Sequence, residues 1–208
     1  MNNKKQLTET ELNERHAFKM LKKKEARDKI IATKLIEKGL IIINTGKGKG
    51  KTTAGFGIVF RAIGNGMRVG IVQFVKGKWE TGERLALDKF KEQVEFHTMG
   101  EGFTWETQDR ERDILAAEKA WKKSKELIND TTNNVVLLDE LNIVLRYNYI
   151  PIGDVLETLK NKPKDKHVII TGRNAKEELI EIADLVTSME IIKHPFRSGV
   201  KAQKGIEF

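Results

Sequence analysis

The sequence predicts an α/β domain of three layers, in which helices cover both faces of a mostly parallel central sheet. Two observations predict this fold class. Along residues 39–208, short apolar runs alternate with helical patterns and are joined by short loops, as is typical of βαβ units with parallel strands. Residues 1–38 contain neither glycine nor proline and are rich in Lys and Glu. We therefore divide the chain into a basic N-terminal helical arm, residues 1–38, and one α/β domain, residues 39–208.

The N-terminal arm carries most of the positive charge of the chain. It holds 11 Lys/Arg against 6 Asp/Glu, which accounts for +5 of the net charge of +8. Sparse apolar positions such as Leu12, Phe18 and Leu21 predict one long helix or two shorter ones over residues 8–37. This helix either covers a ligand or a partner subunit, or is a frayed arm. Because the excess charge lies in the arm and not on a binding face, we do not expect a nucleic-acid partner.

Composition excludes several classes of protein. The 208 residues contain no cysteine, so disulfides, thiolate metal sites and cysteine nucleophiles are excluded. No apolar run approaches the roughly 20 residues that a membrane span needs. No apolar segment follows the polar start MNNKKQLTET, so we expect a cytoplasmic protein without a secretory signal or a membrane partner.

The expected elements follow in chain order. Buried strands are predicted from continuous apolar runs, and helices from longer amphipathic segments. The strands are residues 40–44, 68–75, 94–99, 134–140, 167–172 and 183–193; the helices are residues 52–64, 81–91 and 107–130.

The stretch TGKGKGKTT, residues 45–53, follows the first predicted strand and opens the first helix of the domain. It departs from the phosphate-loop pattern G-x-x-x-x-G-K-[ST] at the first glycine only, since Thr45 stands five residues before Gly50. Glycines allow backbone N–H groups to converge on a phosphate, and the following helix adds its positive end. We therefore predict a P-loop NTPase (RecA-like) domain. Its nucleotide-binding residues are Thr45, Gly46, Lys47, Gly48, Lys49, Gly50, Lys51, Thr52 and Thr53, with Arg61 on the helix that follows.

An acidic motif, the second motif after the glycine loop, completes the predicted site. VVLLDE ends a buried strand in Asp139 and Glu140, where a carboxylate can reach a phosphate-bound cation; the alternative is a helix cap or turn. The Thr52 hydroxyl is the third expected oxygen ligand, so the sequence predicts a Mg²⁺ site at Thr52, Asp139 and Glu140. Phosphate loops serve several reactions. The residues leave open a RecA-like ATPase acting with nucleic acid, a small-molecule kinase with Asp139 as its base, and a nucleotide sensor.

Six motifs narrow these alternatives. They are TGKGKGKTTAGFG, RVGIVQFVKGKWETGER, GFTWETQDRE, VVLLDELN, VIITGRN and HPFRSGVKAQKGIEF, in this order over nearly the whole chain. In this respect the sequence resembles the P-loop-type ATP:corrinoid adenosyltransferases (cob(I)alamin adenosyltransferases). The resemblance implies transfer of the 5′-deoxyadenosyl group of ATP to the Co(I) centre of a corrinoid, with release of tripolyphosphate, in adenosylcobalamin formation. It also implies Lys51, Thr52 and Glu140 as catalytic residues.

The resemblance further implies the corrinoid side of the site. Phe103 and Trp105 stand two residues apart in GFTWET and match family aromatics that line the corrinoid; two core aromatics beside a turn are the alternative. Arg173, just past a strand end, is expected to contact corrinoid or nucleotide, and Lys201 and Gln203 match a C-terminal family motif. A homodimer and a reduced flavin or flavoprotein as electron donor are implied as well. Lys47 departs from the Asn or Asp common in the family at a position near the sugar.

Overall fold

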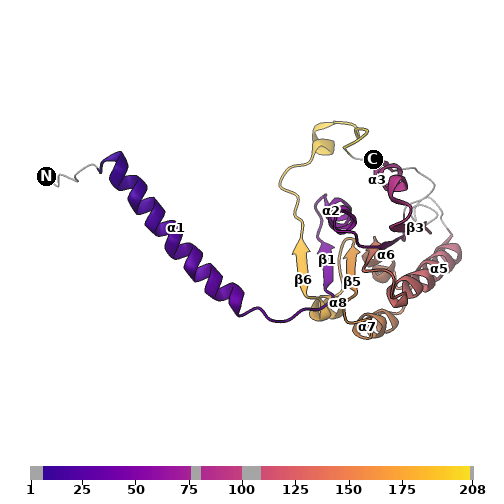
Figure 1. Cartoon of the computed structure of the whole chain (residues 1–208). Coiled ribbons are helices and arrows are strands. Elements are labelled where there is room, and N and C mark those ends of the chain that lie inside the picture. The colour runs from indigo at the N-terminus through magenta and orange to yellow at the C-terminus, as the bar shows by residue number, and fades with distance from the viewer. Residues whose placement is uncertain (1–6, 76–80, 100–108, 207–208) are drawn as a thin grey trace. The chain divides into compact units, whose positions relative to one another are not determined.

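The computed structural model describes residues 7–75, 81–99 and 109–206. The chain divides into two units, Met1–Glu37 and Lys38–Phe208. The described part of the first unit is a single helix, α1 (Glu9–Ala32), with no buried residue (Figure 1). A capping box fixes its start, because the Thr8 hydroxyl accepts the Glu11 N–H while the Glu11 carboxylate accepts the Thr8 N–H at 2.8 Å. The arm is therefore one helix, shorter at its C-terminal end than the pattern over residues 8–37 predicted.

The second unit is built on a six-stranded sheet in which all strand pairs are parallel. This confirms the predicted fold class. The strands are β1 (Ile41–Thr45), β2 (Val69–Gln73), β3 (Val94–Thr98), β4 (Val135–Asp139), β5 (His167–Thr171) and β6 (Leu185–Ser188). Their spatial order is β3-β2-β4-β5-β1-β6. The last strand covers only part of the predicted residues 183–193.

Helices cover both faces of the sheet, as predicted for a three-layer domain (Figure 1). One face packs against α2 (Lys51–Gly64) and α3 (Gly82–Leu87), which the 3₁₀ turn Asp88–Phe90 extends. The other face packs against α5 (Arg110–Asn129), α6 (Leu141–Arg146), α7 (Ile152–Lys160) and α8 (Glu177–Ile182). A second 3₁₀ turn covers Pro195–Ser198. No described helix is both long and apolar enough to pass through a membrane.

Strand β1 shows how the sequence specifies the layers. All five of its residues are buried, with Ile41 and Ile43 in the core beneath α5 to α8 and Ile42 in the core beneath α2. Successive side chains of a strand point to opposite faces, so a continuous apolar run is what a strand covered on both faces requires. The run LIIIN therefore predicted burial on both faces correctly.

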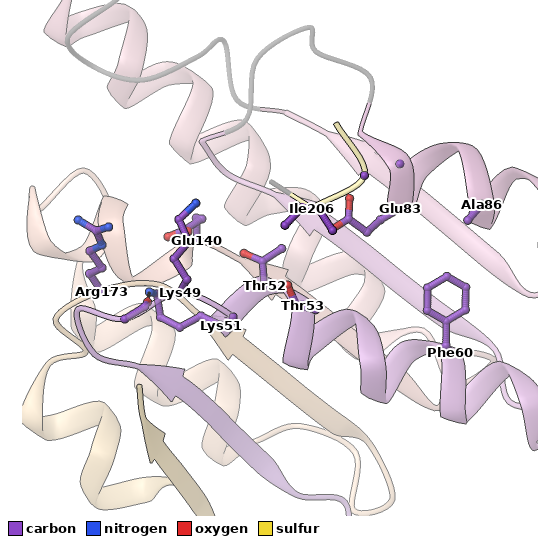
Figure 2. A pocket seen from close by; sticks show the side chains of 14 residues that line it. Lys49, Lys51, Thr52, Thr53, Phe60, Glu83, Ala86, Glu140, Arg173 and Ile206 are labelled. Carbon is purple, nitrogen blue, oxygen red and sulfur yellow. Dashed lines mark hydrogen bonds between the residues drawn. The ribbon is translucent and has the colours of Figure 1, made fainter. Parts of the chain in front are cut away.

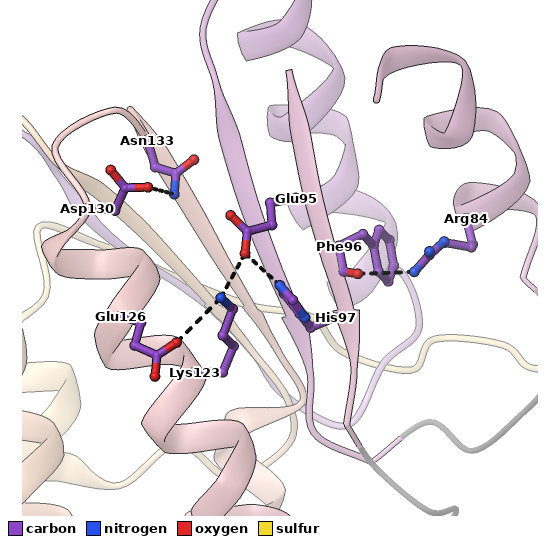
Figure 3. Close-up of polar contacts among 8 residues, drawn as sticks. All are labelled: Arg84, Glu95, Phe96, His97, Lys123, Glu126, Asp130 and Asn133. Atoms are coloured by element: carbon purple, nitrogen blue, oxygen red, sulfur yellow. Dashed lines mark hydrogen bonds and ion pairs between the residues drawn. The ribbon is translucent and has the colours of Figure 1, made fainter. Parts of the chain in front are cut away.

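Helix α3 is held against the edge strand β3 by one arginine (Figure 3). The Arg84 guanidinium lies 4.6 Å from the centroid of the Phe96 ring, and its Nη1 donates to the Phe96 carbonyl at 3.2 Å. The outer part of β3 is tied to α5, because Lys123 Nζ lies 2.8 Å from Glu95 Oε1. The Arg84 contacts hold α3 to β3, near the carboxyl ends of the strands (Figure 1), where ligands bind in open parallel sheets.

Candidate functional site

A cavity of about 930 Å³ lies in the second unit, at the carboxyl ends of strands β1, β4 and β5. Its walls come from the glycine loop, the start of α2, helix α3, the turns after β4 and β5, and the C-terminal segment. The lining residues are Gly48, Lys49, Gly50, Lys51, Thr52, Thr53, Phe60, Gly82, Glu83, Ala86, Glu140, Arg173, Gly205 and Ile206. Figure 2 shows a charged end, with Lys49, Lys51, Glu140 and Arg173, and an opposite end with Phe60 and Ala86. Such a cavity has the size of a ligand site with distinct polar and apolar parts.

The glycine loop leads directly from β1 into α2. Gly46 and Gly50 have φ of 95° and 98°, in the left-handed region, and Gly50 is the N-cap of α2. The N-terminus of this 14-residue helix therefore opens on the cavity through Lys51, Thr52 and Thr53. Free amides and the positive end of a helix dipole make such a position suitable for phosphate.

Lys51 is the most buried cation of the site, with 6% of its surface exposed. Its Nζ donates to the Gly48 carbonyl within the loop. Burial lowers the pKa of Lys51 below the ordinary lysine value, as do Arg173 and Lys49, while the Glu140 carboxylate acts in the opposite direction. A polyphosphate in the cavity would supply the negative charge that keeps this ammonium protonated.

Thr52 and Glu140 are the oxygen donors that suit a divalent cation. Both line the cavity, and a hydroxyl and a carboxylate are the hard ligands that Mg²⁺ takes alongside phosphate oxygens. No group of three or more acidic or histidine side chains that could hold a metal occurs in the part of the chain that the structure describes. The chemistry of the donors therefore fits Mg²⁺ bound together with a nucleotide, and not a cation held by protein carboxylates alone.

Asp139, the other acidic residue of the predicted metal site, does not line this cavity. Its side chain is fully buried, and its two oxygens accept from the Thr171 hydroxyl at 2.8 Å and from Gln73 Nε2 at 2.9 Å. The structure thus separates the two neighbours, with Glu140 at the cavity and Asp139 inside the sheet.

The other predicted residues are divided in the same way. Lys49 and Arg173 line the cavity, and Arg173 is close enough to affect the pKa of Lys51. Thr45 is buried and its hydroxyl accepts the Ala175 N–H at 3.1 Å, while Lys47 and Arg61 are exposed and do not line the cavity. Phe103 and Trp105 lie outside the described residues.

The sequence did not predict six of the lining residues. They are Phe60, Gly82, Glu83, Ala86, Gly205 and Ile206. The C-terminal motif that contains Lys201 and Gln203 does reach the cavity, but through Gly205 and Ile206. The order of the motifs indicated that this segment belongs to the site. Which of its residues line the cavity depends on the path of the chain after β6.

Comparisons with known proteins find similar sequences over nearly the whole chain. Residues 37–208 match the family model described as "ATP:corrinoid adenosyltransferase BtuR/CobO/CobP", and residues 3–31 match "Cob(I)alamin adenosyltransferase N terminal". A corrinoid adenosyltransferase of Sinorhizobium sp. is 65% identical over 93% of this chain and 92% of its own length. The corresponding proteins of Pseudomonas aeruginosa and Escherichia coli K12 are 48% and 44% identical, over 95% and 94% of this chain and 98% and 99% of theirs.

Among solved structures, domain III of the Thermotoga maritima replication initiation protein DnaA is similar to this chain, and the match covers 84% of this chain and 64% of the DnaA chain. The TM-score is 0.38 at 13% identity, which is too weak a likeness to bear on activity.

Proposed function

Because this chain belongs to the ATP:corrinoid adenosyltransferase family, we propose that it transfers the 5′-deoxyadenosyl group of ATP to the Co(I) centre of a corrinoid, releasing tripolyphosphate. The observation that carries the proposal is the grouping of Lys51, Thr52 and Glu140 with Arg173 in one cavity. An electron pair of Co(I) forms the Co–C5′ bond as the C5′–O5′ bond breaks, and the electrons of that bond remain on the tripolyphosphate oxygen.

This displacement at carbon needs no general base. The substrate nucleophile carries its own electron pair, so the protein has to align the two reactants and stabilise the charge that develops on the leaving phosphate. Four positive groups line the cavity around the glycine loop. They are the N-terminal end of α2, the ammonium groups of Lys49 and Lys51 and the guanidinium of Arg173. Their charges make tripolyphosphate a better leaving group.

Thr52 and Glu140 are the residues that would hold Mg²⁺. When bound, the cation supplies positive charge to the phosphate oxygens. The Glu140 carboxylate also acts electrostatically on Lys51 and raises its pKa. It therefore helps to keep the Lys51 ammonium protonated before the nucleotide binds.

For the corrinoid we keep Phe103 and Trp105 as the proposed contacts, with Arg173 at the boundary between corrinoid and phosphates. Phe60 and Ala86 at the opposite end of the cavity offer an apolar surface to a flat ring system or to the adenosine. A homodimer, a reduced flavin or flavoprotein as electron donor and a cytoplasmic location complete the proposal.

One alternative is disfavoured by a specific contact. A small-molecule kinase needs a base for the acceptor hydroxyl, and Asp139 was the candidate. Both of its oxygens accept hydrogen bonds inside the sheet, and it does not line the cavity. The RecA-like ATPase acting with nucleic acid remains the second candidate, favoured only by the basic arm.

An anaerobic assay tests the proposal. The protein is mixed with MgATP and chemically reduced cob(I)alamin, the visible spectrum is followed for adenosylcobalamin, and tripolyphosphate is measured in the same tube. We expect the two products in equal amounts, both lost in Lys51→Ala. Conversion of ATP to ADP and phosphate with unalkylated cobalt would reject the transferase, and stimulation of that hydrolysis by DNA would favour the nucleic-acid ATPase.

A further inference from the structure

A chain of buried hydrogen bonds crosses the carboxyl ends of three adjacent strands behind the cavity. It begins at Gln73, the last residue of β2, whose Nε2 donates to Asp139 Oδ2 at 2.9 Å. Asp139 is the last residue of β4, and its Oδ1 accepts from the hydroxyl of Thr171, the last residue of β5, at 2.8 Å. Gln73 is 2% exposed, and Asp139 and Thr171 are fully buried. The three side chains are thus shielded from water and make their hydrogen bonds to one another.

The chain of hydrogen bonds ends at the backbone N–H of Glu140. The Glu140 N–H donates to Thr171 Oγ1 at 2.9 Å. An amide can only donate and a carboxylate can only accept, so the Thr171 hydroxyl must give its proton to Asp139 and receive the Glu140 N–H on its lone pair. Only one direction of hydrogen bonding is therefore consistent along the whole chain, and the Thr171 hydroxyl has a single orientation.

Glu140 needs such support because its backbone is strained. Its φ of 64° and ψ of 22° lie in the left-handed region, which residues other than glycine rarely adopt because of the steric conflict of their Cβ. This conformation turns the chain from β4 into α6 and brings the side chain of Glu140, but not that of Asp139, to the cavity. Strain of this kind persists only where the surroundings over-determine it.

The side chain of Glu140 is confined from the same strand end. Gly172 directly follows Thr171 and has φ of 123°. A Cβ at this position would lie 3.1 Å from Glu140 Oε2 and 2.9 Å from Asn142 Cβ. The carboxylate thus packs over the bare backbone of Gly172, while Asn142 Nδ2 donates to the Gly172 carbonyl at 3.0 Å. The backbone and the carboxylate of Glu140 are both located by the pair Thr171 and Gly172.

We infer that Thr171 and Asp139 are positioning residues, which hold Glu140 in the conformation that presents its carboxylate to the divalent cation of MgATP. The inference rests on the proposed function, because it assigns these residues to the cation site of that reaction. It also gives Asp139 a different task from the one its sequence motif indicated. Asp139 orients a hydroxyl that orients Glu140, and it does not bind the cation.

The test is the cation dependence of ATP binding, measured without corrinoid so that no reaction occurs. Calorimetry gives the affinity for ATP with and without Mg²⁺, and electron paramagnetic resonance gives the affinity of the ATP complex for Mn²⁺. Thr171→Val keeps the shape of the side chain and removes the hydroxyl. We expect the gain in ATP affinity that Mg²⁺ confers to fall about 10-fold, the usual effect of removing a group that orients a metal ligand. Affinity without Mg²⁺ should stay within about 2-fold, because the loop amides and Lys51 bind the phosphates directly.

Thr171→Ser is the matched control, since it retains the hydroxyl and should retain the Mg²⁺ effect. A residue with a merely structural role would lower affinity equally with and without Mg²⁺, or would change only the melting temperature; either result in Thr171→Val would overturn the inference. Should Thr171→Val fail to fold, Gln73→Met tests the inference at the other end of the chain of hydrogen bonds. It should reduce the Mg²⁺ effect only about 3-fold, because Gln73 contacts Asp139 and reaches Glu140 only through Asp139 and Thr171. An unchanged Mg²⁺ effect would overturn the inference.

The same experiment separates this inference from the proposed function. If the unaltered protein gains no ATP affinity from Mg²⁺, the MgATP site itself is rejected. If the unaltered protein shows the Mg²⁺ effect and both variants match it, only the positioning role is rejected.

Discussion

The carbonyl oxygen of Met189 accepts the backbone N–H of Gly48 at 2.6 Å. The segment that leaves the edge strand β6 therefore supports the glycine loop from behind, and a second bond from the Met189 N–H to the Thr45 carbonyl, at 2.9 Å, fixes the start of the loop. The Gly48 amide is thus engaged inside the protein, although the sequence pattern had suggested that it faces the phosphates. The remaining loop amides, Lys51 and the start of α2 are left to bind them.

This packing predicts the effect of a side chain at Gly46. A Cβ there would lie 2.4 Å from the Met189 carbonyl oxygen, on a residue with φ of 95°. We expect Gly46→Ala to lower the free energy of unfolding by about 1–3 kcal/mol and to weaken ATP binding at least about 10-fold, measured by denaturant titration and calorimetry. Gly57→Ala is the control, because Gly57 lies in α2 and the new Cβ would have no atom within 4 Å apart from its chain neighbours and the backbone of its own helix; it should stabilise the protein by about 1 kcal/mol. Equal behaviour of the two variants would contradict the packing argument.

The lowered pKa of Lys51 predicts proton uptake on ATP binding. Burial lowers this pKa below the ordinary value of 10.5 in the free protein, and the phosphates of a bound nucleotide raise it again. Binding should therefore take up a proton between the lowered value and 10.5, and affinity should fall as the pH rises through this window. Calorimetry in two buffers of different ionisation enthalpy measures the uptake. It should vanish in Lys51→Ala, and a heat independent of buffer in the unaltered protein would show that Lys51 does not contact the phosphates.

Arg173 provides a prediction about charge at the cavity. It lines the cavity beside Lys51, so Arg173→Gln should weaken ATP binding about 10-fold through loss of a charge-assisted contact. Lys176→Gln removes an equal charge three residues away, where Lys176 Nζ instead donates to Asn148 Oδ1 at 2.7 Å. Its effect should stay below about 2-fold. A similar loss in both variants would mean that only the net charge of this region matters.

Asp154 links two helices and predicts how stability depends on pH. It accepts from Trp121 Nε1 at 2.8 Å and from Lys125 Nζ at 2.9 Å, and the contact with Lys125 contributes most to lowering its pKa below 3.8. A carboxylate with a lowered pKa stabilises the fold above its unfolded value, and the stabilisation disappears as the pH falls through the lowered value. Because the side chain is 40% exposed, Asp154→Asn should cost only about 1 kcal/mol at pH 7.

Unfolding by urea at several pH values checks this prediction. The difference between Asp154→Asn and the unaltered protein should shrink below pH 3.8. Glu157→Gln, at an exposed position on the same helix, should show no such trend. A difference that stays constant down to strongly acidic pH would assign the effect to packing and not to charge.

Some features of the site could be predicted because they are local in the chain. The apolar run of β1, the glycines and the Lys51-Thr52 pair are consecutive, so one stretch of sequence specifies strand, loop and helix start together. The short helices α6 and α8, of six residues each, lay below the length at which periodicity separates a helix from a loop. They were not predicted, although α6 begins directly after Glu140.

By itself, the sequence determined the position of the strands and of the helices α2, α3 and α5, that the sheet is parallel, and that a glycine loop opens α2, because burial patterns and glycine positions are local features of the chain; it did not predict α6, α7 and α8. Only the tertiary structure decided which of Asp139 and Glu140 faces the cavity. The partners of Asp139 lie 66 and 32 positions away in the chain, and they meet it because β4 stands between β2 and β5. Strand order is set by the packing of the whole sheet, and no single segment encodes it.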